Sequence, residues 1–410
     1  MELEVEIIRL GAQGDGVAEG PERPIFVPFT LPGERVRVEL DEGGSGHAGL
    51  LEVLEPSPDR VAPICPHFGS CGGCALQHME SHVYLRWKRA QVVAALRSRG
   101  LDAEIEEVRP VPLGSRRRAS LALGRFAGRL ALGYRRARSH DLIDVATCPV
   151  LSPPIVASLP KLKGALAPLL GGNGEAKITV TETGAGLDIV AEGLRPTAAT
   201  LGAFAGQAAA LGVARLTVDG ESIAVGATPT VTLGDVAVRL PPGAFLQASR
   251  EAEGVLVGLV RESVGGAKRI ADMFAGLGTF TLALAGKAAV DAFEADEAAL
   301  AALAEAARRT PKLKPVRTFI RDLFRSPLGA KELQGYDAVV FDPPRAGASA
   351  QAAELAKSRV PKLVAVSCNP GTLARDLRLL VDGGYRIARI VPVDQFLFSP
   401  HIEVVAHLTR

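Results

Sequence analysis

A glycine-containing loop between a predicted strand and a predicted helix decides the fold class of this chain. The stretch runs Arg269-Ile270-Ala271-Asp272-Met273-Phe274-Ala275-Gly276-Leu277-Gly278-Thr279. A strand at its start and a helix from Phe280 to Leu284 are expected from the apolar pattern. Glycines at such a turn let the backbone approach a ligand closely. The stretch therefore predicts a nucleotide-type site in an open α/β sheet.

An acidic residue lies at the distance that ribose recognition requires. Glu294 follows the next apolar run, about 20 residues beyond the loop, where a carboxylate meets ribose hydroxyls. Thr281 stands where the dinucleotide fingerprint has a third glycine, and a lone G-x-G is often only a strand–helix turn. With Glu294 in place, we favour an adenosyl ligand.

Two further predicted strands end in chemically active side chains. Cys368 follows the apolar run 364–366 and precedes a capped helix start, and Asp342 is followed by Pro343, Pro344 and Arg345. Both residue types at strand ends point toward the ligand crevice, and the nearby helix end would favour a thiolate. The alternatives are a small buried hydrophobe and an ordinary proline-terminated strand. We interpret Cys368 as a nucleophile and Asp342 as a ligand-facing carboxylate.

Proline and glycine clusters divide the chain into three predicted domains. Short strand-like runs separated by glycine turns predict an oligonucleotide-binding-type β-barrel over residues 1–57. Mixed helices and alternating strands predict a central α+β domain over 58–240. Alternating strand and helix patterns over 241–410 predict a doubly wound, Rossmann-like α/β domain. The fold class is therefore multidomain α/β.

Four of the five cysteines are clustered near the start of the central domain. They are spaced Cys65-x5-Cys71-x2-Cys74, with Cys148 farther along the chain. In a cytosolic chain such clustering argues for a metal site rather than disulfides. Four thiolates suit either zinc or an iron–sulfur cluster, and the spacing alone does not decide between them.

Hydropathy favours a protein of the cytoplasm, and the charge is spread unevenly along the chain. The net charge of the 410 residues is +2, and no run of 18 uncharged apolar residues predicts a membrane span. Residues 1–60 hold 5 Lys/Arg against 13 Asp/Glu, whereas residues 61–150 hold 14 against 7. Arg116–Arg118 and Arg135–Arg138 stand out in the basic stretch. They are interpreted as phosphate contacts or as a solvated face.

These motifs together resemble the RNA uracil-5 methyltransferase family. The resemblance rests on Asp-Met-Phe-Ala-Gly-Leu-Gly, Phe-Asp-Pro-Pro-Arg, Ser-Cys-Asn-Pro-Gly-Thr and the terminal His401-Ile402-Glu403, in the right order over nearly the whole chain. It implies methyl transfer from S-adenosylmethionine to uridine in RNA, with 23S ribosomal RNA preferred over transfer RNA. It also implies a TRAM barrel at the N-terminus and a [4Fe-4S] cluster on the four clustered cysteines. We expect a monomer without membrane contact.

The resemblance also implies roles for individual residues. Cys368 would add to C6 of the uracil, which makes C5 nucleophilic, and Glu403 would then remove the C5 proton. The base would flip out of its stack to reach the thiol. Ser249 and Thr279 each stand where the family often has asparagine. The implied cofactor-binding residues are Gln247, Phe274, Thr279, Glu294, Asp322 and Asp342.

Three other functions are weighed against this one. An RNA cytosine-5 methyltransferase would use the same thiolate chemistry, but its motif contains a pair of Pro-Cys loops, and it needs an acidic group near cytosine N3. A radical S-adenosylmethionine enzyme needs Cys-x3-Cys-x2-Cys, which the sequence lacks. An RNA-binding protein with a silent methyltransferase fold would not need Cys368, Glu403 and Asp342.

Overall fold

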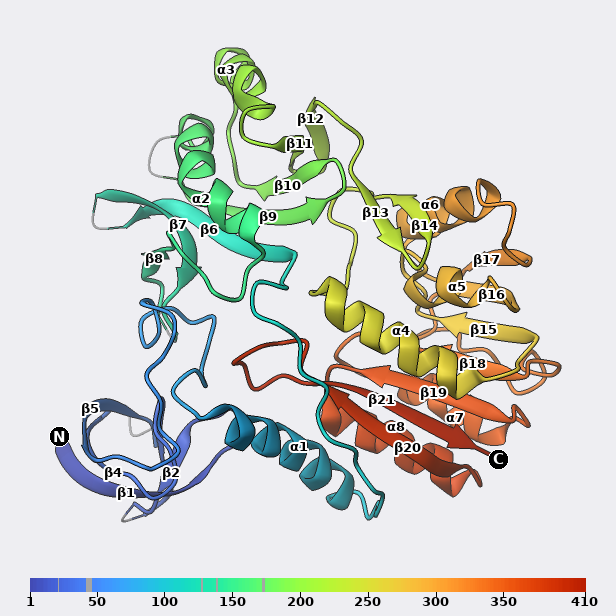
Figure 1. Cartoon of the computed structure of the whole chain (residues 1–410), viewed down its shortest axis with the longest axis horizontal. Helices are drawn as coiled ribbons and strands as arrows, with labels where there is room; N and C mark the ends of the chain where they lie inside the picture. Colours follow the sequence, from blue (N-terminus) through green and yellow to red (C-terminus); the bar gives the residue numbers. More distant parts are fainter. Residues whose placement is uncertain (21, 42–45, 127, 138, 172–173) are drawn as a thin grey trace.

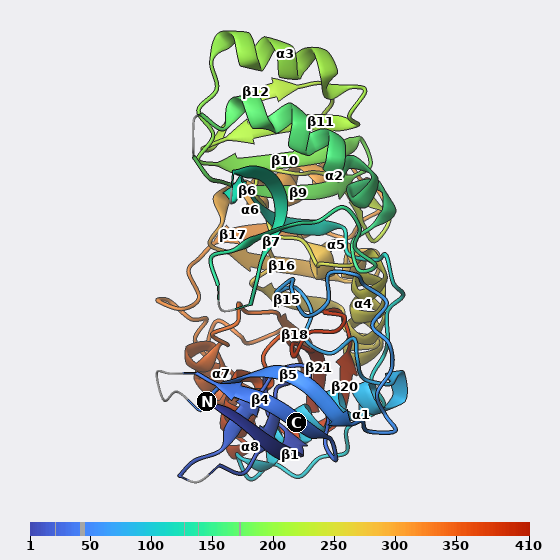
Figure 2. The ribbon, with the colours of Figure 1, turned by 90° about the vertical axis from the view of Figure 1, so that its left-hand side faces the viewer.

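The described chain folds into three large sheets, which follow one another along the sequence. The computed structural model describes residues 1–410 except 21, 42–45, 127, 138 and 172–173. The sheets have five, seven and seven strands, and a two-stranded ribbon joins the second sheet to the third. Figures 1 and 2 both place the N-terminal sheet at the end of the molecule opposite to the helix labelled α3.

The N-terminal sheet is curled into a small barrel, as predicted. Its order is β3-β2-β1-β4-β5, and a bridge between Phe26 and His47 links the two edges. Alternating apolar residues such as Ile7, Val36 and Val38 fill its interior. The strands are β1 (Glu2–Leu10), β2 (Gly16–Ala18), β3 (Ile25–Val27), β4 (Arg35–Leu40) and β5 (Ala48–Glu55).

The central sheet is mostly antiparallel, in the order β12-β11-β10-β9-β6-β7-β8. Only β10 and β11 pair in parallel among its described neighbours, across the helix α3. The elements are β6 (Arg118–Phe126), β7 (Arg129–Arg135), β8 (Leu142–Asp144), α2 (Pro153–Leu166), the 3-10 turn η1 (Ala167–Leu169), β9 (Ala176–Thr183), β10 (Gly186–Glu192), α3 (Ala198–Ala208), β11 (Val213–Val218) and β12 (Glu221–Val225).

The C-terminal sheet is doubly wound, in the order β17-β16-β15-β18-β19-β21-β20. Its first five strands are parallel, and β21 and β20 are antiparallel additions. The strand order reverses between β15 and β18, and at such a switch point open α/β sheets bind ligands. The strands are β15 (Arg269–Met273), β16 (Ala289–Glu294), β17 (Val316–Ile320), β18 (Ala338–Phe341), β19 (Lys362–Ser367), β20 (Arg386–Val393) and β21 (Glu403–Thr409).

Helices cover both faces of this sheet. Buried side chains of α1, α7 and α8 form one core against it, and those of α4 and α5 form the other. The helices are α1 (Ser81–Arg97), α4 (Arg250–Val264), α5 (Thr279–Leu284), α6 (Glu297–Arg308), α7 (Ser349–Lys357) and α8 (Pro370–Asp382). The predicted multidomain α/β fold is therefore confirmed.

Two segments from the middle of the chain pack on the C-terminal sheet. Helix α1 lies beside α8, to the lower left of β20 in Figure 1. The ribbon of β13 (Thr230–Leu233) and β14 (Val236–Arg239) packs against α5 and α6. The domain boundaries at 57 and 240 thus stay predictions, because segments of the predicted central domain pack against the C-terminal domain.

No helix in the described ranges combines the length and the hydropathy that crossing a bilayer requires.

Candidate active site

The loop after β15 has the backbone conformation that a nucleotide-type loop requires. Phe274, Gly276 and Gly278 all have positive φ angles, of 61°, 53° and 89°. A Cβ on Gly278 would lie 2.4 Å from a methyl carbon of Leu303, so only glycine fits there. Gly276 meets no such obstacle, and its surroundings are open. The loop therefore brings its backbone close to open space at the carboxyl end of β15.

Glu294, at the end of β16, is held against this loop. Its carboxylate accepts hydrogen bonds from the N–H groups of Gly276 (2.9 Å), Ala295 (2.6 Å) and Asp296 (2.9 Å). These bonds fix the side chain in place, while the remaining lone pairs of the two oxygens can still accept bonds from a ligand.

Thr281, which stands where the dinucleotide fingerprint has a third glycine, contacts a buried carboxyl group. The Thr281 hydroxyl is fully buried and donates a 2.5 Å hydrogen bond to Asp272 Oδ2. Burial raises the pKa of Asp272 to about 7, although the bonds from Thr281 oppose the shift. Asp272 was not predicted as a site residue, although an acidic residue within an otherwise apolar strand was the available signal.

Cys368 lies immediately after β19, at the start of α8. The next residue, Asn369, is the N-cap of α8 and accepts a bond from Gly371 N–H at 3.0 Å. Its amide donates to the backbone oxygen of Arg345 at 3.2 Å, as does the Thr372 hydroxyl at 3.3 Å. The Asp-Pro-Pro-Arg loop and the cysteine loop are thereby tied together.

The expected preference of Cys368 for the thiolate form is outweighed in the free protein. The thiol is half-buried, and burial together with the negative charges of Glu403 and Asp342 raises its pKa to about 11. The backbone N–H and Arg345 oppose this shift only in part. At neutral pH the thiol is therefore protonated.

Four polar side chains form a continuous hydrogen-bonded chain beside the cysteine. Gln247 Nε2 donates to Asp342 Oδ2 at 3.0 Å. Gln395 Nε2 donates both to Gln247 Oε1 at 2.8 Å and to Glu403 Oε2 at 3.0 Å. Gln247, Gln395 and Glu403 are nearly completely buried. Gln247, which was predicted, and Gln395, which was not, thus connect two of the predicted site carboxylates.

Both carboxyl groups hold their protons more tightly than usual. Burial and the neighbouring charge of Asp272 raise the pKa of Asp342 to about 7. Burial and Asp342 raise the pKa of Glu403 well above its ordinary value, and the bond from Gln395 opposes that rise. Glu403 Oε1 has no hydrogen-bond partner among the described residues.

The remaining predicted cofactor residues lie around the ends of β15 and β17. The ring of Phe274 is 5.4 Å from that of Phe324, and Thr279 is the first residue of α5. Asp322 accepts bonds from the N–H groups of Phe324 (2.9 Å) and Arg325 (3.3 Å). Asp322 therefore orders the turn after β17, which carries exposed apolar side chains.

Two arginines of the predicted phosphate-binding cluster point inward. Arg117 is 3% exposed, donates to the backbone oxygen of Gln247 at 3.1 Å and pairs with Glu253 at 2.6 Å. Arg118 donates to the backbone oxygen of Ala244 at 2.6 Å. The nearly buried Arg117 is therefore neither a phosphate contact nor part of a solvated face, whereas for the half-buried Arg118 both interpretations stay predictions. The two arginines hold the segment that carries Gln247 against the central sheet.

A buried lysine of α1 holds the segment between β20 and β21, drawn in red in Figure 1. Lys88 is fully buried, pairs with Asp394, and donates to the backbone oxygens of Phe396 (2.9 Å) and His401 (2.7 Å). Sequence reasoning missed this residue. The available signal was a lysine on an apolar stripe of α1, four residues after the buried Tyr84.

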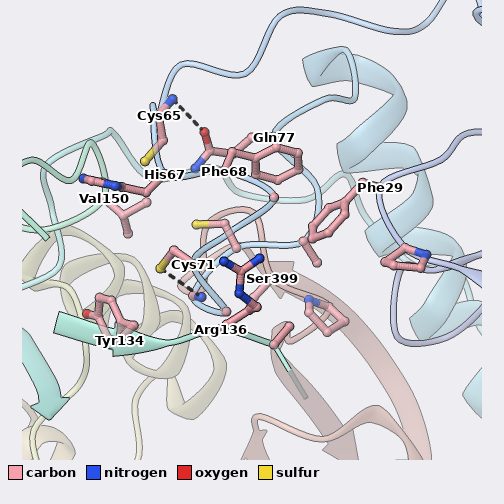
Figure 3. A pocket seen from close by; sticks show the side chains of 18 of the residues that line it. Phe29, Cys65, His67, Phe68, Cys71, Gln77, Tyr134, Arg136, Val150 and Ser399 are labelled. Carbon is pink, nitrogen blue, oxygen red and sulfur yellow. Dashed lines mark hydrogen bonds between the residues drawn. The ribbon is translucent and has the colours of Figure 1, made fainter. Parts of the chain in front are cut away.

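The four clustered cysteines line one cavity of about 1040 Å³ between the barrel, the central sheet and the segment 396–401. Figure 3 shows Cys65 and Cys71 there with Tyr134 and Arg136. All four thiols are half-buried, and burial together with the charges of Cys148, Cys71 and Cys65 raises the pKa of Cys74. The described residues contain no group of three or more His, Cys, Asp or Glu placed as for a single metal ion. Arg138 lies outside the described residues.

Two protein families match this chain. The tRNA (Uracil-5-)-methyltransferase family matches residues 231–410, and the TRAM domain matches residues 1–47. The first match contains the glycine loop, Asp342, Cys368 and Glu403, and the second contains the first four strands of the barrel.

Relatives cover the chain from end to end. A protein of Brucella suis named as an uncharacterized RNA methyltransferase is 48% identical over 99% of this chain and 98% of its own length. The 23S rRNA (uracil(1939)-C(5))-methyltransferase RlmD of Pectobacterium atrosepticum is 35% identical over 98% of this chain and 93% of its own.

A solved structure has the same architecture throughout. The tRNA (uracil-54, C5)-methyltransferase of Pyrococcus abyssi, in complex with S-adenosyl-L-homocysteine, matches with a TM-score of 0.76 and 25% identity over 99% of both chains. Taken with the glycine loop and the cysteine, carboxylate and glutamine cluster, these matches show that the chain belongs to the S-adenosylmethionine-dependent RNA uracil-5 methyltransferase family, with a TRAM domain at its N-terminus.

Proposed function

We propose that this enzyme makes 5-methyluridine in 23S ribosomal RNA through a covalent adduct between Cys368 and C6 of the target uracil. The observation that carries the proposal is the convergence of Cys368, Asp342 and Glu403 at the ends of neighbouring strands, within mutual electrostatic reach. The full-length likeness to RlmD supports ribosomal RNA as the substrate. The structural likeness to a tRNA-modifying enzyme keeps transfer RNA as the second candidate.

The proposed roles follow from what each side chain can do to a uracil. Addition of Cys368 sulfur to C6 places electron density on C5, which then attacks an electrophilic methyl group. S-adenosylmethionine supplies that methyl group on a positively charged sulfonium. A positive charge nearby would also lower the pKa of the Cys368 thiol, which the two carboxylates keep high in the free protein.

Proton removal from C5 is assigned to Glu403. Its buried, unpartnered Oε1 is available to accept a proton, and its raised pKa makes it a stronger base than an ordinary carboxylate. Asp342 is proposed to contact both the cofactor and the target base. Once the C5 proton has left, the Cys368 sulfur can be expelled and the aromatic pyrimidine restored.

The cofactor is proposed to lie over the glycine loop, between the ends of β15 and β16. Replacing Glu294 with alanine removes both the proposed ribose acceptor and the carboxylate that fixes Gly276 N–H. We expect S-adenosylmethionine to bind about 10- to 100-fold more weakly, because a charge-assisted hydrogen bond is worth roughly 1.5–3 kcal/mol. Isothermal calorimetry on Glu294→Ala measures this, with Glu297→Ala on α6 as a nearby control. Unchanged affinity of Glu294→Ala would contradict the assignment.

The cysteine cavity is proposed to hold a [4Fe-4S] cluster on Cys65, Cys71, Cys74 and Cys148. Four thiols in one cavity are the donor set of such a cluster. The same donor set also suits zinc, and the cluster is preferred here because the resemblance to the family implies it. Ala75 and Leu76, beside Cys74, donate to the Phe398 oxygen at 2.8 and 3.1 Å, so the role proposed is structural.

Metal analysis tests this cluster. Protein purified without oxygen is expected to be brown and to contain about four irons per chain. Replacing Cys71 with serine should abolish the colour and the iron, whereas Cys368→Ala, outside the cavity, should leave both unchanged. One zinc per chain and no iron would contradict the prediction.

The RNA is proposed to run along the same cavity toward Cys368. Arg116 and Arg136 line it, and the Phe29 and Phe68 rings stand edge to face there at 5.0 Å. Cations bind phosphates and aromatic rings stack on unpaired bases. This local face would let an acidic barrel contact RNA. The cytoplasmic location and the monomeric state stay predictions.

Labelled methyl transfer tests the substrate. Unmodified 23S ribosomal RNA and unmodified transfer RNA are incubated separately with the protein and labelled S-adenosylmethionine, and the product is digested to nucleosides. We expect 5-methyluridine from the ribosomal RNA. Label in transfer RNA alone would favour the second candidate. Label in 5-methylcytidine would favour the cytosine enzyme, and no label in either RNA would favour a silent binding protein.

A further inference from the structure

Gln395 is the one described side chain that both contacts Glu403 and connects it to the rest of the polar chain. It follows β20 and is 4% exposed. Its Nε2 atom donates to Glu403 Oε2 and to Gln247 Oε1. Neither the family resemblance nor the matches assign a role to this residue.

The orientation of the Gln395 amide is fixed by the network. Asp342, when ionised, offers only acceptors, so Gln247 must turn its Nε2 toward it. Gln247 Oε1 then faces Gln395, which must present its own Nε2. Because the same nitrogen carries a second hydrogen, that hydrogen points to Glu403. The chain of bonds therefore delivers a donor to the Glu403 carboxylate.

The backbone around Gln395 is held as firmly as its side chain. The preceding Asp394 pairs with the buried Lys88 and accepts a 3.0 Å bond from the Tyr84 hydroxyl. Gln395 N–H donates to the backbone oxygen of Val393 at 2.9 Å. The amide therefore has little freedom to follow Glu403 if that side chain moves.

We infer that Gln395 is a positioning residue that holds Glu403 in place as an ionised base during removal of the C5 proton. The inference rests on the proposed role of Glu403. The Gln395 N–H stabilises the charged form of the carboxylate, whereas Asp342, at the end of β18, and Cys368, at the end of β19, carry or acquire like charge. In the described part of the chain, the Gln395 amide is the group that opposes burial and Asp342.

Two substitutions of Gln395 are expected to change the ionisation of Glu403 in the same direction. Gln395→Met keeps the length of the side chain and removes the donor. Gln395→Glu keeps the shape and places a second carboxyl group beside Glu403. Each change favours the protonated form of Glu403, because it removes a donor or adds like charge. A smaller fraction of Glu403 is then ionised at a given pH, so proton removal slows and recovers as the pH rises.

The test follows the covalent RNA adduct in a single turnover, with full-length protein, unmodified 23S ribosomal RNA and S-adenosylmethionine. The rate of adduct breakdown is measured on denaturing gels between about pH 6 and pH 9. The acidic limb of this pH–rate profile reports the ionisation of the base. We expect both Gln395 variants to shift this limb upward by about one to two pH units. Methyl transfer into the adduct, which precedes proton removal, should be slowed less than adduct breakdown. Gln351→Met on α7 is the matched control, because this buried glutamine bonds only the Leu328 backbone in the described residues. Gln351→Met should lower the stability of the fold and leave the acidic limb of the pH–rate profile unchanged.

The outcomes separate this inference from the proposed function. If a folded Gln395 variant shows the same acidic limb of the pH–rate profile as the wild type, while Glu403→Gln still traps the adduct, the inference is wrong. If Glu403→Gln does not trap it, the proposed base is wrong, and the fault lies in the proposed function. Should Gln395→Met fail to fold, Gln395→Glu decides the question, because it retains the size and polarity of the side chain.

Discussion

Replacing Cys368 with alanine is expected to abolish both methyl transfer and covalent attachment to RNA. Without the sulfur there is no adduct at C6, and C5 of uracil remains too weak a nucleophile to accept the methyl group. Loss of a covalent nucleophile costs about 10⁴- to 10⁶-fold in rate, so the expected product lies below detection. Labelled methyl transfer and a denaturing gel of the protein–RNA mixture measure the two effects together.

The fold should tolerate this substitution. The Cys368 side chain is half-buried, and its loop is held by Asn369 and Thr372 bonds to the Arg345 backbone rather than by the thiol. Cofactor affinity and the thermal midpoint should therefore stay near the wild-type values, which serves as the control for folding. An active Cys368→Ala protein would show that the proposed mechanism is wrong.

The sequence predicted the residues that lie at strand ends because topology leaves them little choice. Parallel strands of an open sheet present their carboxyl ends at one edge, so Asp342, Cys368 and Glu294 had to lie along it once the strands were identified. Glu403 is instead the first residue of an antiparallel strand, and it reaches the same edge because β21 pairs with β19 in reverse. Only the resemblance pointed to this residue beforehand.

Contacts between distant parts of the chain could not be predicted in this way. Arg117 lies in a basic run that is typical of phosphate binding, yet Glu253, far along the sequence, draws it inward. Gln395 owes its importance to Gln247 and Glu403 together, and no local pattern distinguishes it from other glutamines. The raised pKa of Cys368 depends likewise on two carboxylates brought in by other strands.

Replacing Glu403 with glutamine is expected to trap the enzyme on its RNA. The amide oxygen of the new side chain can still accept the bond from Gln395 Nε2, so the polar chain and the segment 394–402 should stay in place. Cys368 can still add to C6, and C5 can still take the methyl group. Expulsion of the sulfur then fails, because the C5 proton has no acceptor. Turnover should fall by about 10²- to 10⁴-fold, while linked, methylated RNA accumulates on a denaturing gel.

Comparison with Cys368→Ala distinguishes loss of the base from misfolding. A misfolded protein would neither form the adduct nor release it, whereas Glu403→Gln should form the adduct and fail only to release it. Wild-type turnover by Glu403→Gln would require another base, and His401 is the nearest candidate in sequence. Burial and the positive charges of Arg345, Lys88 and Arg116 lower the pKa of His401, so its imidazole is neutral and able to accept a proton. His401→Gln is therefore the paired variant. If it traps the adduct and Glu403→Gln does not, His401 is the base, whereas trapping by Glu403→Gln alone assigns proton removal to Glu403.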